Sequence, residues 1–115
     1  MEHKMKLQNN PFEMIKSKTK TIEMRLFDEK RSKINIGDVI EFTNISNGEI
    51  MKVKVLNLYK FSTFADLYKN FDKVKLGYKE NELAKPEDME KYYAADEINK
   101  YGVVGIEINL LDSDM

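Results

Sequence analysis

Hydrophobic and polar residues alternate in several short stretches of the chain, which is the pattern of β-strands that bury one face. The clearest examples run from Lys20 to Leu26, where every second side chain is apolar, and from Val103 to Leu111. Val39 to Asn44 and Ile50 to Tyr59 flank Asn47-Gly48, the dipeptide that most strongly favours a tight hairpin turn. With a short candidate at Met5 to Leu7, the pattern predicts about five or six strands.

Apolar residues at helical spacing predict short helices between these strands. Asn10-Pro11-Phe12-Glu13 is typical of a helix start, because Asn10 can cap the helix and Pro11 suits its first turn. Ser62 or Thr63 can cap a second helix, in which Phe64 to Phe71 has helical periodicity.

The segment from 72 to 85 has no clear period and is expected to be irregular, whereas Pro86 opens a third helix that ends before Gly102. Short helices inserted between hairpin-linked strands indicate an α+β fold. We expect a small β-barrel with peripheral short helices, and an open α+β sheet is the alternative that periodicity leaves open.

Composition limits the kinds of protein that this chain can be. Its 115 residues, 42% of them hydrophobic, suit one globular domain over residues 1–115. The chain has no cysteine and a single histidine, His3, which disfavours a zinc site, and no metal or organic cofactor is implied. No apolar run approaches the roughly 20 residues of a membrane span, so we expect a cytoplasmic protein that does not enter a membrane.

The most informative chemistry lies in the predicted strand at Lys20-x-x-Glu23-x-Arg25. Strict alternation puts Lys20 on the face opposite Glu23 and Arg25, so the three share one site only if Lys20 precedes the regular strand or a bulge intervenes. If they converge, Glu23 can orient the Arg25 guanidinium toward a phosphate or a base edge. The alternative is that Glu23 and Arg25 form an ordinary ion pair at the surface or at the end of the barrel, worth about 0 to 1 kcal/mol if exposed.

These residues also carry a family resemblance. The Lys20 to Arg25 motif, the turn at Gly37-Asp38, the stretch Lys54 to Phe64 and the closing Tyr101-Gly102-Val103-Val104-Gly105-Ile106 resemble the ASCH domain of the PUA-like superfamily, from Met5 to Leu110. The resemblance implies a PUA-like barrel with a cleft beside the motif. It also implies a protein that binds RNA or a modified nucleoside.

The family usually has glycine where this chain has Lys18, so that either the turn differs or Lys18 adds charge to the cleft. Tyrosines near the closing strand, Tyr92, Tyr93 and Tyr101, are candidates to stack on a base, with burial in the core as the alternative. The predicted ligand-binding residues are therefore Lys18, Lys20, Glu23, Arg25, Tyr93 and Tyr101.

Residues 16 to 33 form the most basic part of a chain whose net charge is −1. Nucleic-acid binding would therefore depend on a local basic patch, since bulk charge gives no attraction. Such a cluster is either a surface that follows a phosphate backbone or a solvated edge.

A hydrolase is the second functional hypothesis. The chain resembles, more distantly, PUA-like amidohydrolases that remove an acetyl group from modified cytidine, in which a lysine and a threonine three residues later take part. Here Glu23 stands in place of that threonine, and Thr21 would point to the opposite face of the strand. If the protein is an enzyme, acting on acetylcytidine or on RNA, Lys20 and Glu23 are the predicted catalytic residues.

Overall fold

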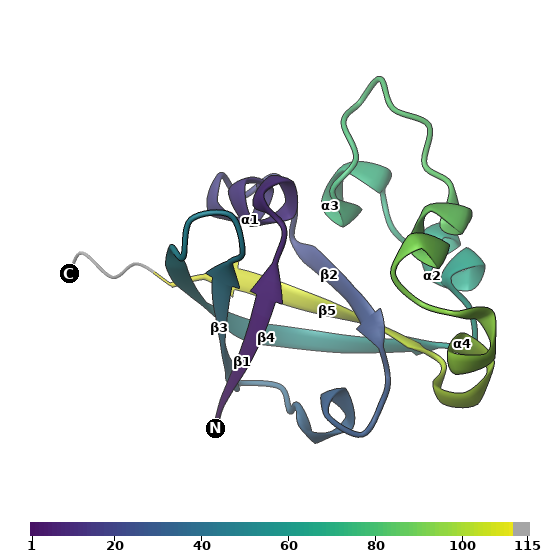
Figure 1. Cartoon of the computed structure of the whole chain (residues 1–115), viewed down its shortest axis with the longest axis horizontal. Coiled ribbons are helices and arrows are strands. Elements are labelled where there is room, and N and C mark those ends of the chain that lie inside the picture. The colour runs from purple at the N-terminus through teal and green to yellow at the C-terminus, as the bar shows by residue number, and fades with distance from the viewer. Residues whose placement is uncertain (112–115) are drawn as a thin grey trace.

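Five strands form a single sheet in the computed structural model, which describes residues 1–111 (Figure 1). The strand order is β1-β3-β4-β5-β2, in which β1 and β3 are parallel and the other neighbours are antiparallel. The strands are β1 (Glu2–Leu7), β2 (Ile22–Leu26), β3 (Val39–Asn44), β4 (Ile50–Phe61) and β5 (Val103–Leu110). The predicted hairpin at Asn47-Gly48 joins β3 to β4 and is confirmed.

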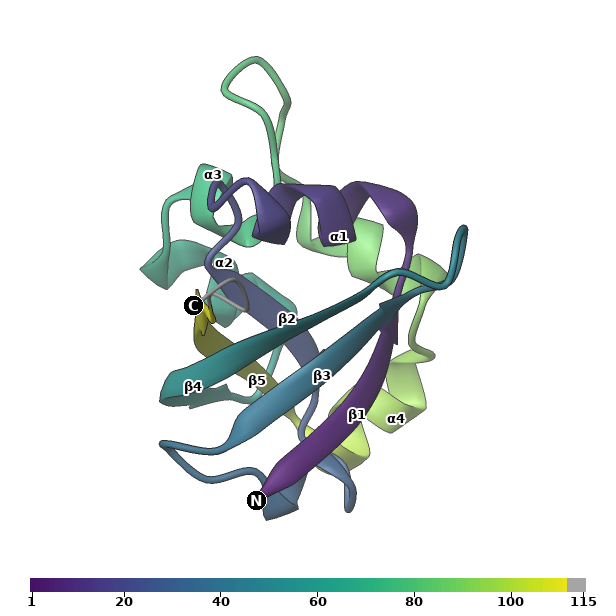
Figure 2. The same ribbon diagram turned by 90° about the vertical axis from the view of Figure 1, so that its left-hand side faces the viewer.

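The sheet curls strongly, so that its two edge strands, β1 and β2, approach each other without pairing (Figure 2). The result is a half-barrel with short helices around it, which confirms the predicted α+β barrel-like fold. Within residues 1–111, one side-chain hydrogen bond links the two edges: Arg25 in β2 donates from Nη2 to the Lys6 carbonyl in β1 at 2.9 Å.

The two faces of β2 have different environments. Ile22, Met24 and Leu26 belong to a core cluster with Phe64 and other residues of the peripheral helices. A second cluster is formed mainly by β1, β3, β4 and β5, with Phe12 and Ile15 of the first helix. Because Glu23 and Arg25 alternate with the apolar residues of β2, they face away from the first cluster.

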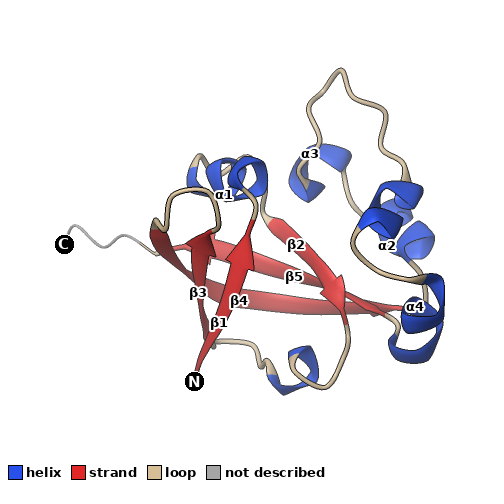
Figure 3. Ribbon diagram, in the orientation of Figure 1, coloured by secondary structure: helices blue, strands red, loops and turns tan. Residues whose placement is uncertain are grey.

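The helices are short and mostly surround the end of the sheet where β2 and β5 lie (Figure 3). They are α1 (Asn9–Lys16), η1 (Arg31–Lys33), α2 (Phe64–Asn70), α3 (Lys73–Leu76), η2 (Pro86–Lys91) and α4 (Ala95–Tyr101). No helix among residues 1–111 is sufficiently long and apolar to cross a membrane.

The helix caps agree with the sequence prediction at α2 but not at α1. Thr63 caps α2 by accepting from the Asp66 amide, as predicted. The prediction that Asn10 caps α1 is wrong. Gln8 is the N-cap residue, and the Phe12 amide already donates to the Gln8 carbonyl. The helix therefore begins before Asn10, which lies in its first turn.

The segment from 72 to 85 is not wholly irregular, because it contains α3. This helix has one turn, capped by the Asp72 side chain and ended by Gly77 in the left-handed region, and one turn is too short to produce a detectable period. The predicted third helix is two elements, η2 and α4, because the backbone is extended at Ala94.

Candidate functional site

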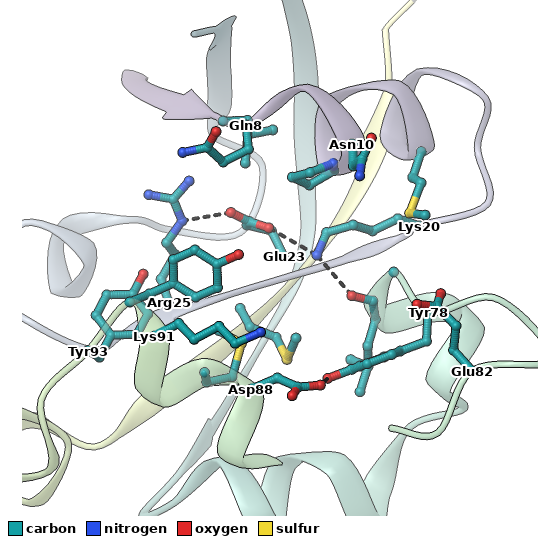
Figure 4. Close-up of a pocket in the computed structure, with 18 of the residues that line it drawn as sticks. Gln8, Asn10, Lys20, Glu23, Arg25, Tyr78, Glu82, Asp88, Lys91 and Tyr93 are labelled. Atoms are coloured by element: carbon teal, nitrogen blue, oxygen red, sulfur yellow. Dashed lines mark hydrogen bonds and ion pairs between the residues drawn. The ribbon is translucent and has the colours of Figure 1, made fainter. Parts of the chain in front are cut away.

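A pocket of about 620 Å³ lies between β2 and the start of α1 on one side and α3 and η2 on the other (Figure 4). Lys20, Glu23 and Arg25 all line this cavity, which we call the main pocket. Five basic and three acidic side chains contribute to its lining, together with tyrosines and apolar residues. The lining therefore combines charged groups with apolar surface and carries an excess of positive charge.

The three motif residues converge because β2 begins only at Ile22. Lys20 precedes the regular strand, and its own amide donates to the Met14 carbonyl at the end of α1 instead of joining a ladder. The alternation rule therefore does not place Lys20 on the opposite face. A position before the regular strand is one of the two conditions under which the sequence predicts that Lys20 shares a site with Glu23 and Arg25.

The motif residues form one ionic chain. Arg25 Nε donates to Glu23 Oε2 at 2.6 Å, and Lys20 Nζ lies 3.2 Å from Glu23 Oε1. Lys20 Nζ also donates to the Leu76 carbonyl of α3 at 2.9 Å (Figure 4). Both carboxylate oxygens of Glu23 are thus occupied, and the two cations are held at fixed positions along one wall of the pocket.

The ionic chain of these three side chains is buried, and burial affects the pKa values of its members. Lys20 is 6% exposed and Glu23 is 4% exposed. Burial alone would raise the pKa of Glu23, but the charges of Lys20 and Arg25 outweigh it and lower that pKa below the ordinary value. For Arg25, burial acts against the charged form, yet the carboxylate of Glu23 raises the pKa overall. Glu23 and Arg25 therefore stay charged inside a buried network, which is not the exposed ion pair of the alternative interpretation.

The opposite wall comes from α2, α3 and η2, and sequence reasoning missed most of it. The Tyr68 and Tyr78 hydroxyls lie 2.8 Å apart, and Tyr78 donates to Asp88 Oδ2 at 2.9 Å. Burial raises the pKa of Tyr78, and its hydrogen bonds with Tyr68 and Asp88 raise it further, so that its hydroxyl stays protonated at neutral pH. In the sequence Asp88 has the features of an ordinary acidic helix start, and nothing there indicates that it lines the pocket and bonds with Tyr78.

Gly77 fits closely over the Lys20 side chain. A Cβ at this position would lie 3.1 Å from Lys20 Cδ, and the backbone φ is +108°, a conformation that favours glycine. The neighbouring Thr21 amide donates to the Lys75 carbonyl at 3.0 Å. Helix α3 is therefore fastened to the motif by two hydrogen bonds and by this close approach.

Four of the six predicted ligand-binding residues line the main pocket, and two do not. Lys20, Glu23, Arg25 and Tyr93 line the main pocket, as does Tyr92, whereas Lys18 and Tyr101 are not among its lining residues. The ring of Tyr93 stacks on Phe64 at a centroid distance of 5.9 Å and an interplanar angle of 17°. Tyr93 is thus both packed in the core and available on one side to the pocket.

Lys18 keeps the left-handed conformation that glycine would provide. Its φ is +69°, and the turn ends α1 with the Lys18 amide donating to the Ile15 carbonyl and the Thr19 amide to the Met14 carbonyl. This is the hydrogen-bond pattern of a Schellman motif. The turn itself is therefore unchanged by the departure from glycine.

Two kinds of chemical group are not found among the described residues of the site. Among residues 1–111, no group of three His, Cys, Asp or Glu side chains lies close enough to hold a metal ion. The described residues that line the pocket include no serine, threonine or cysteine. Thr21, the substitute nucleophile that the sequence disfavours, is not among the lining residues.

Fold and site together define a small PUA-like half-barrel with a buried ionic motif at a pocket of mixed charged and apolar lining. The model of the ASCH domain family matches residues 5–112 of this sequence. The chain therefore belongs to the ASCH domain family, as the motif and the closing strand predicted.

Two solved structures are similar to this chain over nearly its whole length. The crystal structure of the hypothetical protein PH0355 has a TM-score of 0.82 and 33% identity, and the match covers 96% of this chain and 100% of that one. The solution NMR structure of protein PF0455 from Pyrococcus furiosus has a TM-score of 0.74 and 34% identity, with coverage of 97% and 99%. No curated protein sequence matches this chain significantly.

Proposed function

We propose that this ASCH domain binds RNA or a modified nucleoside in the main pocket and does so in the cytoplasm. The observation that carries the proposal is the convergence of Lys20, Glu23 and Arg25 on one wall of a 620 Å³ cavity. Ligand pockets commonly occupy about 300 to 1,000 Å³ and combine apolar surface with a few fixed polar groups. A base needs a flat apolar surface and hydrogen-bonding partners at its edge, and the pocket lining supplies tyrosine rings together with the donors of Lys20 and Arg25.

Each motif residue has a distinct part in this proposal. Glu23 uses both oxygens to hold its neighbours and acts as a positioning residue. An ammonium group has three N–H donors, and Lys20 uses two of them on Leu76 and Glu23, which leaves one for a ligand. Arg25 has no partner at Nη1 within residues 1–111, so that side of its guanidinium is free to donate.

The opposite wall supplies the complementary surface. The ring of Tyr93 lies near the Arg25 guanidinium, and the Lys91 side chain, from the end of η2, also lines the pocket (Figure 4). An aromatic ring that is already fixed by packing loses little entropy when a base stacks on it. Tyr93 is therefore the stacking residue that we propose, and Lys91 is an exposed cation that adds to Lys20 and Arg25.

Hydrolysis of an acylated nucleoside such as acetylcytidine, or of RNA, is the second candidate. The observation in its favour is the buried Lys20–Glu23 pair, 3.2 Å apart at the wall of the pocket. Against it, Glu23 has a lowered pKa and both oxygens occupied, which makes it a weak general base. A threonine nucleophile is also missing from the described lining. We therefore favour binding.

The proposal is tested by fluorescence anisotropy with a labelled single-stranded RNA of about ten nucleotides, and by titration of a panel of nucleosides that includes N4-acetylcytidine. The variants are Lys20→Gln, Arg25→Gln and Lys91→Gln. Loss of one hydrogen bond from a charged group costs about 1.5 to 3 kcal/mol, so binding in the first two should weaken roughly 10- to 100-fold.

Lys91→Gln keeps the test valid if the buried variants fail to fold, because Lys91 is exposed and has no side-chain hydrogen bond within the described residues. Lys54→Gln is the matched control, an exposed lysine of β4 outside the pocket. Wild-type protein that binds neither RNA nor any nucleoside, or equal binding by all variants, would reject the proposal. Turnover of acetylcytidine or RNA that Lys20→Gln abolishes would favour the hydrolase instead.

A further inference from the structure

A second hollow of about 400 Å³ lies beside the main pocket, where the open edges of the half-barrel approach each other. Five of its seven lining residues are basic, and among residues 1–111 no carboxylate lines it. We call it the basic hollow, lined by Lys4, Met5, Lys6, Arg25, Lys30, Arg31 and Thr43. Lys6 and Arg25 line both cavities, so the two are neighbours that share a boundary.

Much of the positive charge in the basic hollow is not neutralised by the protein. Lys4, Lys6 and Lys30 are exposed, and none of them has an ion pair within residues 1–111. Surface lysines elsewhere do have partners, since Lys16 pairs with Glu49 at 2.5 Å. The hollow therefore concentrates positive charge in a chain whose net charge is −1.

Arg31 adds an unsatisfied donor. Its Nη1 pairs with Asp28 Oδ2 at 2.8 Å, but its Nε is buried without any hydrogen-bond partner in the part of the chain that the structure describes. A buried N–H group without an acceptor costs about 1 to 3 kcal/mol. Arg31 is one of the residues that line the hollow, and an anionic oxygen is the kind of acceptor that its Nε lacks.

Arg25 connects the two cavities chemically. Its Nε is held by Glu23 at the wall of the main pocket, and its Nη2 is held by the Lys6 carbonyl at the edge of β1. The guanidinium is thus fixed in orientation at the boundary. Its Nη1 has no partner within residues 1–111 and can donate to a ligand, and a guanidinium with lysines around it commonly binds a phosphate group.

We propose that the basic hollow binds a phosphate of the same ligand whose base occupies the main pocket. This rests on the function proposed above and makes it more specific: the ligand is a phosphorylated one, not a free nucleoside. The phosphate belongs either to a mononucleotide or to the backbone of an RNA strand, and the chemistry that the hollow recognises is the same. Arg25 lies between base and phosphate and touches both parts.

The test compares nucleosides with their 5′- and 3′-monophosphates as competitors of the labelled RNA, at several salt concentrations. We expect a monophosphate or the RNA to bind at least about tenfold more tightly than the corresponding nucleoside. In the triple variant Lys4→Gln/Lys6→Gln/Lys30→Gln this advantage should disappear. The slope of log K against log salt for RNA should also become shallower, by about 0.7 for each phosphate of a single strand that the protein no longer neutralises.

The matched control is Lys54→Gln/Lys69→Gln/Lys100→Gln, which removes equal charge from exposed lysines that line neither cavity. It should keep the preference for the phosphorylated ligand. Competition by monophosphates would identify a mononucleotide site, whereas a salt slope that changes only for RNA would identify the backbone as the source.

Two negative outcomes are distinguishable. If nucleosides and monophosphates bind equally well and the triple variant behaves like the wild type, the phosphate site is refuted while the function proposed for the main pocket stands. If the wild type binds no nucleoside, monophosphate or RNA, the proposed function fails and this inference fails with it.

Discussion

At the scale of single residues, Glu23 is the centre of the site because it compensates two buried cations at once. Removing one partner of a buried ion pair leaves an uncompensated charge in a poorly solvated place, which typically costs about 3 to 5 kcal/mol. Replacing both partners of a buried ion pair by apolar residues of similar volume destabilises the fold far less. The motif is therefore expected to matter for folding as well as for binding.

We predict that Glu23→Gln lowers the free energy of unfolding by roughly 3 kcal/mol, because Lys20 and Arg25 remain buried without their carboxylate. Adding Lys20→Met should restore part of that stability, since one of the orphaned charges is removed. Urea denaturation followed by circular dichroism measures both changes.

Glu49→Gln is the control for Glu23→Gln, because Glu49 pairs with Lys16 at the surface, where solvent screens ion pairs and they contribute little to stability. If Glu23→Gln were no more destabilised than Glu49→Gln, the buried network would have no more weight than a surface pair. The account of the main pocket as a prearranged charged wall would then be wrong.

At the scale of elements, α3 has a larger role than its length suggests. It consists of one turn, yet its carbonyl groups at Lys75 and Leu76 accept from Thr21 and from the Lys20 side chain. The Asp72 cap and Gly77 define both of its ends. This one turn therefore positions the cation at the end of the ionic chain.

We predict that Gly77→Ala both destabilises the fold and displaces Lys20. A non-glycine residue held at positive φ costs on the order of 1 to 3 kcal/mol, and the new Cβ would meet Lys20 Cδ at 3.1 Å. Gly37→Ala is the control, since its φ is +94° and nothing lies within 4 Å of the added carbon. NMR should show altered shifts at Lys20 and Thr21 only in Gly77→Ala, and equal shifts in both variants would contradict this.

The elements differ in how well the sequence predicts them, for physical reasons. The strands β3 and β4 follow from strict alternation and from the Asn47-Gly48 turn, both of which are local. Helix α3 could not be predicted, because one turn contains no repeat. Lys20 was included in the predicted strand because its neighbours alternate, although its amide bonds with Met14 of α1 instead of joining the ladder.

The site was predictable only in part, for the same reason. Lys20, Glu23 and Arg25 lie within six residues of sequence, so their convergence needed only one local condition, the late start of β2. The acceptor of Lys20 is Leu76, 56 residues away, and such a partner is brought close by tertiary packing alone. Tyr78 and Asp88 on the opposite wall were missed for this reason.

At the scale of the whole molecule, the half-barrel leaves β1 and β2 as edges that do not pair with each other. An open edge needs other interactions to hold it in place. One is the bond from Arg25 to the Lys6 carbonyl. Another lies at the opposite end of β1, where His3 Nε2 and Asp38 Oδ2 are 2.8 Å apart and the Asn35 amide donates to the same carboxylate at 2.9 Å.

This second anchor makes the stability of the fold depend on pH. The hydrogen bond with His3, together with that from the Asn35 amide, lowers the pKa of Asp38 from its ordinary value of 3.8 to about 2. Between pH 3.8 and pH 2, Asp38 therefore binds a proton more readily in the unfolded chain than in the folded one. The contribution of Asp38 is therefore fully present above pH 4 and disappears as the pH falls toward 2.

We predict that Asp38→Asn lowers the midpoint of thermal unfolding modestly at pH 7 and that the difference from the wild type shrinks steadily between pH 4 and pH 2. Amide hydrogen exchange should show where the destabilisation occurs, because the amides of β1 should exchange faster in Asp38→Asn than in the wild type while those of β4 and β5 change less. Glu29→Gln is the control, since the Glu29 side chain has no hydrogen bond or ion pair among the residues described. A pH-independent difference, or uniform acceleration across all strands, would mean that Asp38 does not fasten the open edge of the half-barrel.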